Sequence, residues 1–212
     1  MSQQPKITLF HVHKDAMTAA VDTFQRDWPE ARISNILEDG LFEWIRETGR
    51  VVPDMYAAFE DLTDYALDRG ADGILYSCSA FHECIDACIA KHDQPLLKPN
   101  EAMIEAALNQ GRRIAVLATV EPTITSISAE IETLAIKTGR PVTVIPIMVE
   151  DAFDAMAAGD GARHDRLVAA AAKDTTNVDV IVLSQFTLSR AAPAVQAATD
   201  IPILNSPAAA VR

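Results

Sequence analysis

Ile7-Thr-Leu-Phe-His-Val12 returns in outline 107 residues later in the chain, as Ile114-Ala-Val-Leu-Ala-Thr119. Two further pairs share this offset: Asp72-Gly-Ile-Leu-Tyr-Ser-Cys78 matches Asp179-Val-Ile-Val-Leu-Ser-Gln185, and Gln94-Pro-Leu-Leu97 matches Ile201-Pro-Ile-Leu204. Three matches at a single offset indicate a duplication, so we predict two halves built on one strand plan. The match sets Cys78 opposite Gln185, at the ends of equivalent strands.

Apolar runs of strand length alternate with longer amphipathic segments. Continuous apolar runs are typical of strands covered on both faces, as in a parallel sheet. The expected strands are Ile7–Val12, Ile33–Leu37, Ile74–Ser77, Pro95–Leu97, Ile114–Ala118, Val142–Ile147, Val180–Leu183 and Ile201–Leu204. The expected helices are Ala16–Asp27, Leu41–Glu47, Pro53–Arg69, Phe81–Lys91, Glu101–Asn109, Thr123–Lys137, Glu150–Ala158, Arg163–Lys173 and Arg190–Ala197.

We therefore predict an α/β fold with two pseudo-symmetric, doubly wound lobes of flavodoxin or Rossmann type, each with a parallel sheet. Residues 1–98 with 205–212 are expected to form the first lobe, and residues 99–204 the second.

The 212 residues carry a formal charge of −12, which argues against nucleic-acid or membrane partners. A small anionic substrate remains compatible, because backbone amides supply a local positive field. No signal peptide or membrane-length apolar run is visible, and three cysteines make no disulfide framework. These features favour the reducing cytoplasm.

Strand ends are where chemistry is expected, since ligands of doubly wound sheets sit beyond the carboxyl ends of the strands. Cys78 ends one predicted strand and precedes the helix expected from Phe81. Free helix N–H groups would lower the pKa of such a thiol, which could then take or give a proton next to a carboxylate. The alternative is a buried cysteine that packs as a small apolar residue.

Cys84 and Cys88 lie one helical turn apart and share a face. With His82 they would suggest a metal site, but their sulfurs would need partners elsewhere in the chain. Helix packing is the preferred interpretation.

His11 and His13 close the first predicted strand, where alternation sends both rings to one side. We expect one of them to bind a carboxylate or orient a substrate. Two alternatives stay open. The pair could begin the metal site of a hydrolase, which needs further ligands on later strands, or could be loop histidines without a role. We predict no metal at this pair.

Small residues with hydroxyls or accessible backbone N–H groups follow the strand ends in both halves. We expect them to form anion-binding nests, although such residues also cap helices without any ligand. The candidates are Ser79, Ala80, Thr119, Thr123 and Thr187. Phe81 and Phe186 flank the proposed cleft and favour an apolar substituent on the substrate.

Five segments resemble the aspartate/glutamate/hydantoin racemase superfamily. Tyr76-Ser-Cys-Ser-Ala-Phe81 resembles its first catalytic-cysteine segment, and Leu117-Ala-Thr-Val-Glu-Pro-Thr123 resembles its central anion-binding segment. Val182-Leu-Ser-Gln-Phe-Thr187 stands where the superfamily has a second cysteine. Leu97-Lys-Pro-Asn-Glu-Ala-Met103 and Leu204-Asn-Ser-Pro207 resemble the segments that follow each half, so the resemblance covers essentially the whole chain.

The resemblance implies two pseudo-symmetric lobes with a site between them, a homodimer, and cofactor-free chemistry on a small carboxylate. One residue removes the α-proton and another, on the opposite face, returns it. Cys78 matches the first acid/base cysteine, and Ser79 matches the adjacent polar residue. Thr119 and Thr123 match the carboxylate-binding segment. Relatives include arylmalonate decarboxylase and maleate isomerase.

Gln185 departs from this pattern, because an amide neither gains nor loses a proton near neutral pH. The leading interpretation is an isomerase of racemase type acting at the α-carbon of a small carboxylate, with His11 or His13 as the second base. A decarboxylase of a malonate-like diacid that uses Cys78 alone is the second. A non-catalytic carboxylate-binding protein is the third.

Overall fold

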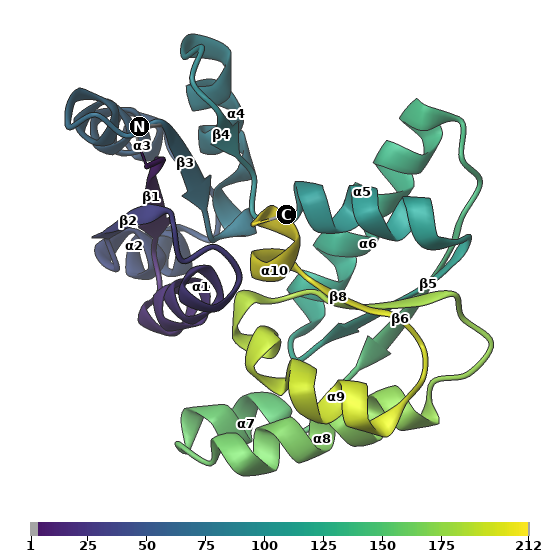
Figure 1. Ribbon diagram of the computed structural model, residues 1–212. Helices are drawn as coiled ribbons and strands as arrows, with labels where there is room; N and C mark the ends of the chain where they lie inside the picture. Colours follow the sequence, from purple (N-terminus) through teal and green to yellow (C-terminus); the bar gives the residue numbers. More distant parts are fainter. Residues whose placement is uncertain (1–3, 212) are drawn as a thin grey trace. The chain divides into compact units, whose positions relative to one another are not determined.

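A computed structural model describes residues 4–211 of the chain (Figure 1). The backbone divides into two compact units, one ending at Pro99 and the other running from Asn100 to Ala210. Each unit contains a four-stranded parallel sheet, with strand order β2-β1-β3-β4 in the first and β6-β5-β7-β8 in the second. The α/β class and the parallel sheets predicted from the sequence are therefore confirmed.

The first unit contains the strands β1 (Lys6–His11), β2 (Arg32–Leu37), β3 (Gly73–Tyr76) and β4 (Leu96–Leu97). Its helices are α1 (Lys14–Asp27), α2 (Gly40–Thr48), α3 (Pro53–Asp68), α4 (His82–Lys91) and the 3₁₀ turn η1 (Ser79–Phe81). Phe10 and Tyr76 of the sheet pack with Phe59 of α3, and their rings lie 4.8 to 6.1 Å apart between centroids. These aromatic contacts join the two central strands to the helical layer.

The second unit contains the strands β5 (Arg113–Ala118), β6 (Thr143–Met148), β7 (Val180–Leu183) and β8 (Ile203–Asn205). Its helices are α5 (Glu101–Gln110), α6 (Glu121–Thr138), α7 (Ala152–Ala157), α8 (Gly161–Asp174), α9 (Ala192–Ala198) and α10 (Ser206–Ala210), with the 3₁₀ turn η2 (Phe186–Ala191).

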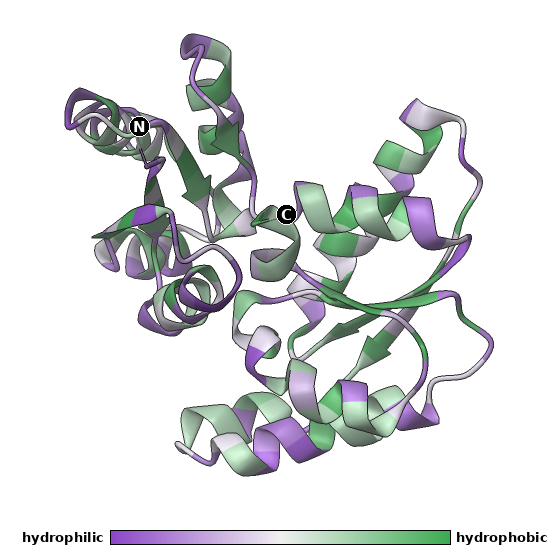
Figure 2. Cartoon of the chain, viewed as in Figure 1, coloured by the Kyte–Doolittle hydropathy of each residue, from purple (hydrophilic) through white to green (hydrophobic). Residues whose placement is uncertain are grey.

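Both faces of β5 and β7, the central strands of the second sheet, are buried, which explains their uninterrupted apolar sequences. Val116 and Val182 pack with residues of α5 and α6 on one face. Leu117 and Leu183, the next residues along, pack with residues of α8, η2 and α9 on the other. Figure 2 shows these strands in the green of apolar residues.

The two sheets share one register, which confirms the duplication. Ile7 pairs with Gly73 in the first sheet, and Ile114 pairs with Val180 in the second, both displaced by the 107 residues seen in the sequence. The pairing with the edge strands β2 and β6 does not keep this offset. Lys6 pairs with Arg32 in the first sheet, whereas its counterpart Arg113 pairs with Thr143 in the second. The longer first crossover of the second unit is taken up by α6, an 18-residue helix where α1 has 14.

In each sheet, an aspartate just before the third strand accepts hydrogen bonds from backbone N–H groups at the start of the first strand. Asp72 accepts a hydrogen bond of 2.8 Å from the backbone N–H of Lys6. Asp179 accepts bonds of 2.7 and 2.8 Å from the backbone N–H groups of Arg112 and Arg113. These bonds hold the pKa of the Asp179 carboxyl below its usual range.

The end of the chain differs from the predicted division into lobes. Residues 205–212 were expected with the first lobe, whereas α10 packs against α5 within the second unit. The buried hydroxyl of Ser206 donates to Asn100 across 2.8 Å. A short helix at this place was not predicted. Among the described residues, no helix is long and apolar enough to cross a membrane.

Candidate functional site

The carboxyl edge of the first sheet brings together His11, Asn35 and Ser77, directly beside Cys78. His11 is the last residue of β1, Asn35 lies on β2, and Ser77 follows β3. Nδ1 of His11 lies 2.8 Å from the Ser77 hydroxyl, and Nε2 lies 3.1 Å from Oδ1 of Asn35. Three parallel strands are thus linked at the edge where ligands of such sheets bind.

The proton positions follow from these partners. Oδ1 of Asn35 can only accept, so Nε2 of His11 carries the hydrogen and Nδ1 accepts from the Ser77 hydroxyl. His11 is fully buried, and burial lowers its pKa to about 4, although the hydrogen bond to Asn35 opposes this shift. The imidazole is therefore neutral near pH 7, with both ring nitrogens engaged.

Cys78 lies in extended backbone between β3 and the turn η1, and its side chain is partly exposed. The sequence predicts a lowered pKa for this thiol, and the structure contradicts that prediction. Burial raises the pKa of Cys78 to about 11, with a smaller opposing effect from the Ala80 backbone N–H. The physical reason is that desolvation of the thiolate outweighs the few N–H groups of a three-residue 3₁₀ turn.

The other two cysteines are core residues, as predicted. Cys84 is fully buried and Cys88 is 1% exposed, and both belong to the apolar cluster of the first unit. The Thr63 hydroxyl donates to the Cys88 sulfur. In residues 4–211 no group of three histidine, cysteine, aspartate or glutamate side chains is placed to hold a metal ion.

His13 does not share the environment of His11, contrary to the prediction that both rings face one side. It is the N-cap of α1, and its Nδ1 accepts from the backbone N–H of Asp15 across 3.3 Å. Its exposed ring lies edge-on to Phe42, 5.4 Å between centroids. The helix begins right after the strand, so the alternation that the prediction assumed ends at His11.

The carboxyl edge of the second sheet joins Thr119 to Gln185. Oε1 of Gln185 accepts from the Thr119 backbone N–H at 2.8 Å and from the Thr119 hydroxyl at 3.0 Å. Both side chains are partly exposed. Ser184, beside Gln185, donates its hydroxyl to the Leu117 carbonyl and holds the end of β7 against β5.

The remaining candidate residues differ in how exposed they are. Ser79, Thr123 and Thr187 are partly exposed, and Ala80 is exposed. Phe186 is buried, and Phe81 is fully buried with its ring 5.0 Å from that of Phe59. Phe81 is therefore a core residue and not the cleft-lining ring that the sequence suggests.

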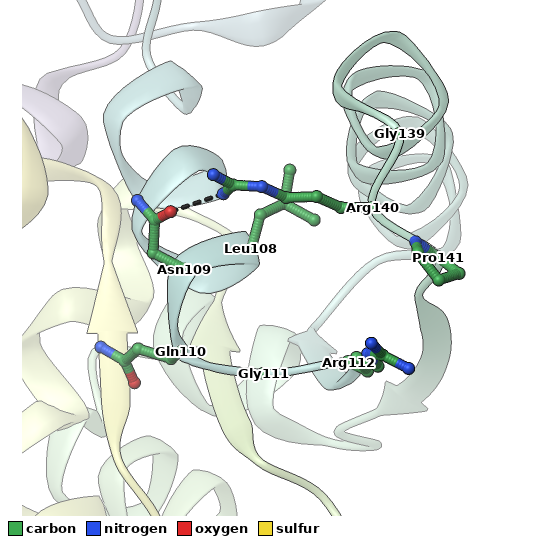
Figure 3. A pocket seen from close by; sticks show the side chains of 8 residues that line it. All are labelled: Leu108, Asn109, Gln110, Gly111, Arg112, Gly139, Arg140 and Pro141. Carbon is green, nitrogen blue, oxygen red and sulfur yellow. Dashed lines mark hydrogen bonds between the residues drawn. The ribbon is translucent and has the colours of Figure 1, made fainter.

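Two pockets open on the surfaces of the units. One, of ≈ 430 Å³, lies beside the expected site residue His13 and is lined by Val12, His13, Lys14, Asp39, Gly40, Phe42 and Glu43. The other, of ≈ 290 Å³, lies where α5 and α6 end and β5 begins (Figure 3). Arg140 donates to Asn109 there, and no carboxylate, thiol or imidazole lines that pocket. The second pocket therefore lacks groups for acid/base chemistry.

Asn35 is the site residue that the sequence reasoning missed. It lies on an edge strand with a largely exposed pattern, so an asparagine there carries no distinctive signal. Only its pairing opposite Leu9 of β1 brings it within reach of the His11 ring.

The profile of the family described as Asp/Glu/Hydantoin racemase matches residues 41–212. Aspartate racemase from Picrophilus torridus is a structural neighbour, with a TM-score of 0.72, 13% identity and coverage of 98% of this chain and 92% of that one. Allantoin racemase from Klebsiella pneumoniae has a TM-score of 0.65 and 14% identity, with coverage of 98% of this chain and 84% of that one. Glutamate racemase from Francisella tularensis subsp. tularensis was solved in complex with D-glutamate. It has a TM-score of 0.63 and 13% identity, with coverage of 98% of this chain and 78% of that one. No curated protein sequence matches the chain.

Proposed function

Because the chain belongs to the Asp/Glu/hydantoin racemase family, we propose that it moves a proton at the carbon next to the carboxylate of a small molecule, with Cys78 as acid/base. The observation that carries this proposal is the placement of Cys78. Cys78 is partly exposed as a residue, whereas Cys84 and Cys88 are buried, and Cys78 follows β3 at the carboxyl edge of the first sheet. The glutamate racemase neighbour that holds D-glutamate supports a small carboxylate as ligand.

The first candidate reaction is isomerisation of racemase type without a cofactor. The Cys78 thiolate takes the α-proton, the electron pair passes into the carboxylate as an enediolate, and a second group returns a proton to the other face. Gln185 is an amide and His11 is neutral with both nitrogens engaged. His13, whose ring is exposed, is the remaining histidine candidate for the second group.

The second candidate is decarboxylation of a malonate-like diacid, and two observations favour it. A thiol with a pKa of about 11 is protonated near pH 7 and ready to donate. Gln185, at the second-cysteine position, supplies no base. The bond to one carboxylate breaks, CO₂ leaves, and the electron pair forms an enediolate. Cys78 then protonates the carbon, and the thiolate recovers its proton from water.

Proton NMR in D₂O tests both candidates together. The substrates are D- and L-glutamate, D- and L-aspartate, 2-hydroxy acids and substituted malonates. Exchange of the α-proton reports the first reaction, and loss of malonate with appearance of its mono-acid reports the second. Cys78→Ala is the control and should abolish either signal.

A signal that survives Cys78→Ala would remove Cys78 from the acid/base role. Binding without exchange or decarboxylation across the whole panel would leave the third interpretation, a carboxylate-binding protein. We also propose a homodimer, which light scattering of the purified chain tests directly.

A further inference from the structure

We propose that the side-chain amide nitrogen of Gln185 is the hydrogen-bond donor that binds the ligand carboxylate, and that Thr119 is a positioning residue which aims it. This inference deepens the proposed function and rests on it for the class of ligand. It reassigns the role that the sequence gives to Thr119, from direct contact with the carboxylate to support of the contacting side chain.

The orientation of the Gln185 amide is set by a donor of known polarity. The Thr119 backbone N–H can only donate, so the atom 2.8 Å from it must be the carbonyl oxygen Oε1. The Thr119 hydroxyl adds a second donor to the same oxygen at 3.0 Å. An amide flip would place NH₂ against N–H, so this orientation is the one the partners permit.

Two N–H groups are left on Nε2 of Gln185. Within residues 4–211, no hydrogen-bond acceptor pairs with that nitrogen, and the side chain is partly exposed. A carboxylate offers two acceptor oxygens and bonds more strongly to such donors than a neutral acceptor does.

The backbone under Gln185 is held on both sides. Before it, the Ser184 N–H and hydroxyl both donate to the Leu117 carbonyl, at 3.1 and 2.7 Å. After it, Phe186 is buried and the Leu188 N–H donates back to the Gln185 carbonyl across 2.9 Å. The backbone that carries Gln185 is therefore ordered before a ligand binds, and the two bonds from Thr119 order the side chain, which favours affinity.

A rival arrangement makes the opposite prediction. If Oε1 of Gln185 only occupies a nest that belongs to the ligand carboxylate, binding must displace it from Thr119. Removing Gln185 would then tighten binding, because the competitor is gone. Under our proposal, removing Gln185 weakens binding, because the donors are gone.

Calorimetric titration of the 212-residue chain with sodium malonate distinguishes these two arrangements. The measurements use the Cys78→Ala background, in which no substrate is consumed. Gln185→Ala should weaken malonate binding at least about tenfold, the usual scale for a hydrogen bond to a charged group. Gln185→Glu keeps an acceptor for Thr119 but replaces the donors with negative charge, so it should weaken binding more.

Thr119 is tested by a double-mutant cycle. Thr119→Ser keeps both bonds to Gln185 and should bind malonate as tightly as the parent, which is the Cys78→Ala variant. Thr119→Val removes the hydroxyl bond and should weaken binding several-fold when Gln185 is present, with no further loss in the Gln185→Ala background. A direct contact between Thr119 and the carboxylate would instead give an equal loss in both backgrounds. Thermal unfolding of each variant confirms that it is folded.

Tighter or unchanged malonate binding in Gln185→Ala overturns the inference, and so does the absence of malonate binding to the parent. The proposed function fails separately, through the absence of proton exchange and decarboxylation in D₂O. Turnover with unaltered malonate affinity in Gln185→Ala would refute the Gln185 assignment alone.

Discussion

The Ser77 hydroxyl donates to Nδ1 of His11 across 2.8 Å, whereas Ser184, its equivalent in the second unit, donates to the backbone carbonyl of Leu117. The cause lies at the end of the first strand of each unit, where His11 corresponds to Ala118. Alanine offers no side-chain acceptor, so the serine turns to the main chain. The duplicated framework thus carries an imidazole at the end of its first strand in one unit and an alanine in the other.

Acidification should destabilise the protein through His11. Its folded pKa of about 4 lies below the unfolded value of 6.5, so the unfolded chain binds more protons between these values. The free energy of unfolding should therefore fall as pH drops from 6.5 to 4, by up to about 3 kcal/mol from this group. Urea unfolding at a series of pH values measures the slope.

The matched control for this stability measurement is the exposed imidazole of His13. His11→Gln should lower the stability at pH 7 and flatten the slope between pH 6.5 and 5 by more than His13→Gln does. An equally steep slope in His11→Gln would show that the pH dependence comes from other groups.

Alkylation should single out Cys78 and should accelerate with pH. Cys84 and Cys88 are buried, so iodoacetamide should reach Cys78 first. With a pKa of about 11, its thiolate fraction grows about tenfold per pH unit below that value. Mass spectrometry of the labelled peptide should show a rate still rising at pH 10. A rate that levels off near pH 8 would contradict the raised pKa.

The pH dependence of turnover should tell whether Cys78 acts first as base or as acid. Removal of an α-proton needs the thiolate, so α-exchange should rise about tenfold per pH unit from 7 to 10. Decarboxylation ends with a proton from the thiol and should be nearly flat over the same range. A bell centred near pH 7 would fit neither role for this thiol.

Replacing Gln185 with cysteine should alter the stereochemistry. In the natural chain, decarboxylation of a prochiral malonate in D₂O should give one enantiomer, because Cys78 delivers hydrogen from one face. Gln185→Cys supplies a second thiol and should introduce racemisation of a resolved amino acid, measured by chiral chromatography. Gln185→Ser, which is close in size to the cysteine variant but supplies no thiol, should not introduce racemisation.

If the natural chain already racemises such an amino acid, a second base exists. His13→Ala then becomes the informative variant. Racemisation that survives it would exclude His13 from that role.

Gly111 should tolerate no side chain. A Cβ at this position would lie 2.1 Å from Cβ of Asp179, whose carboxylate accepts from the N–H groups of Arg112 and Arg113. Gly111→Ala should lower the free energy of unfolding by about 1–3 kcal/mol, the usual scale of overpacking, as measured by urea unfolding. The control is Gly49→Ala, at a φ of 65° with nothing within 4 Å of the added Cβ, which tests strain without a clash. Equal losses in both variants would contradict the steric argument.

The architecture follows from local patterns in the amino-acid sequence. The 107-residue offset located equivalent strands, and the apolar runs predicted the eight strands of residues 4–211 to within a few residues. For the central strands this succeeds because strands buried on both faces must be continuously apolar, a property that is local in sequence. The position of Cys78 beyond β3 and the packing of Cys84 and Cys88 followed from the same patterns.

The charge states and the hydrogen-bond partners of the candidate site depend on the folded arrangement of the chain. The raised pKa of Cys78 and the neutral state of His11 depend on how much surrounding chain removes water from each group. The partners Asn35 of His11 and Thr119 of Gln185 are 24 and 66 residues away in the chain. Strand register brings such residues together, and no local pattern of residues encodes that distance.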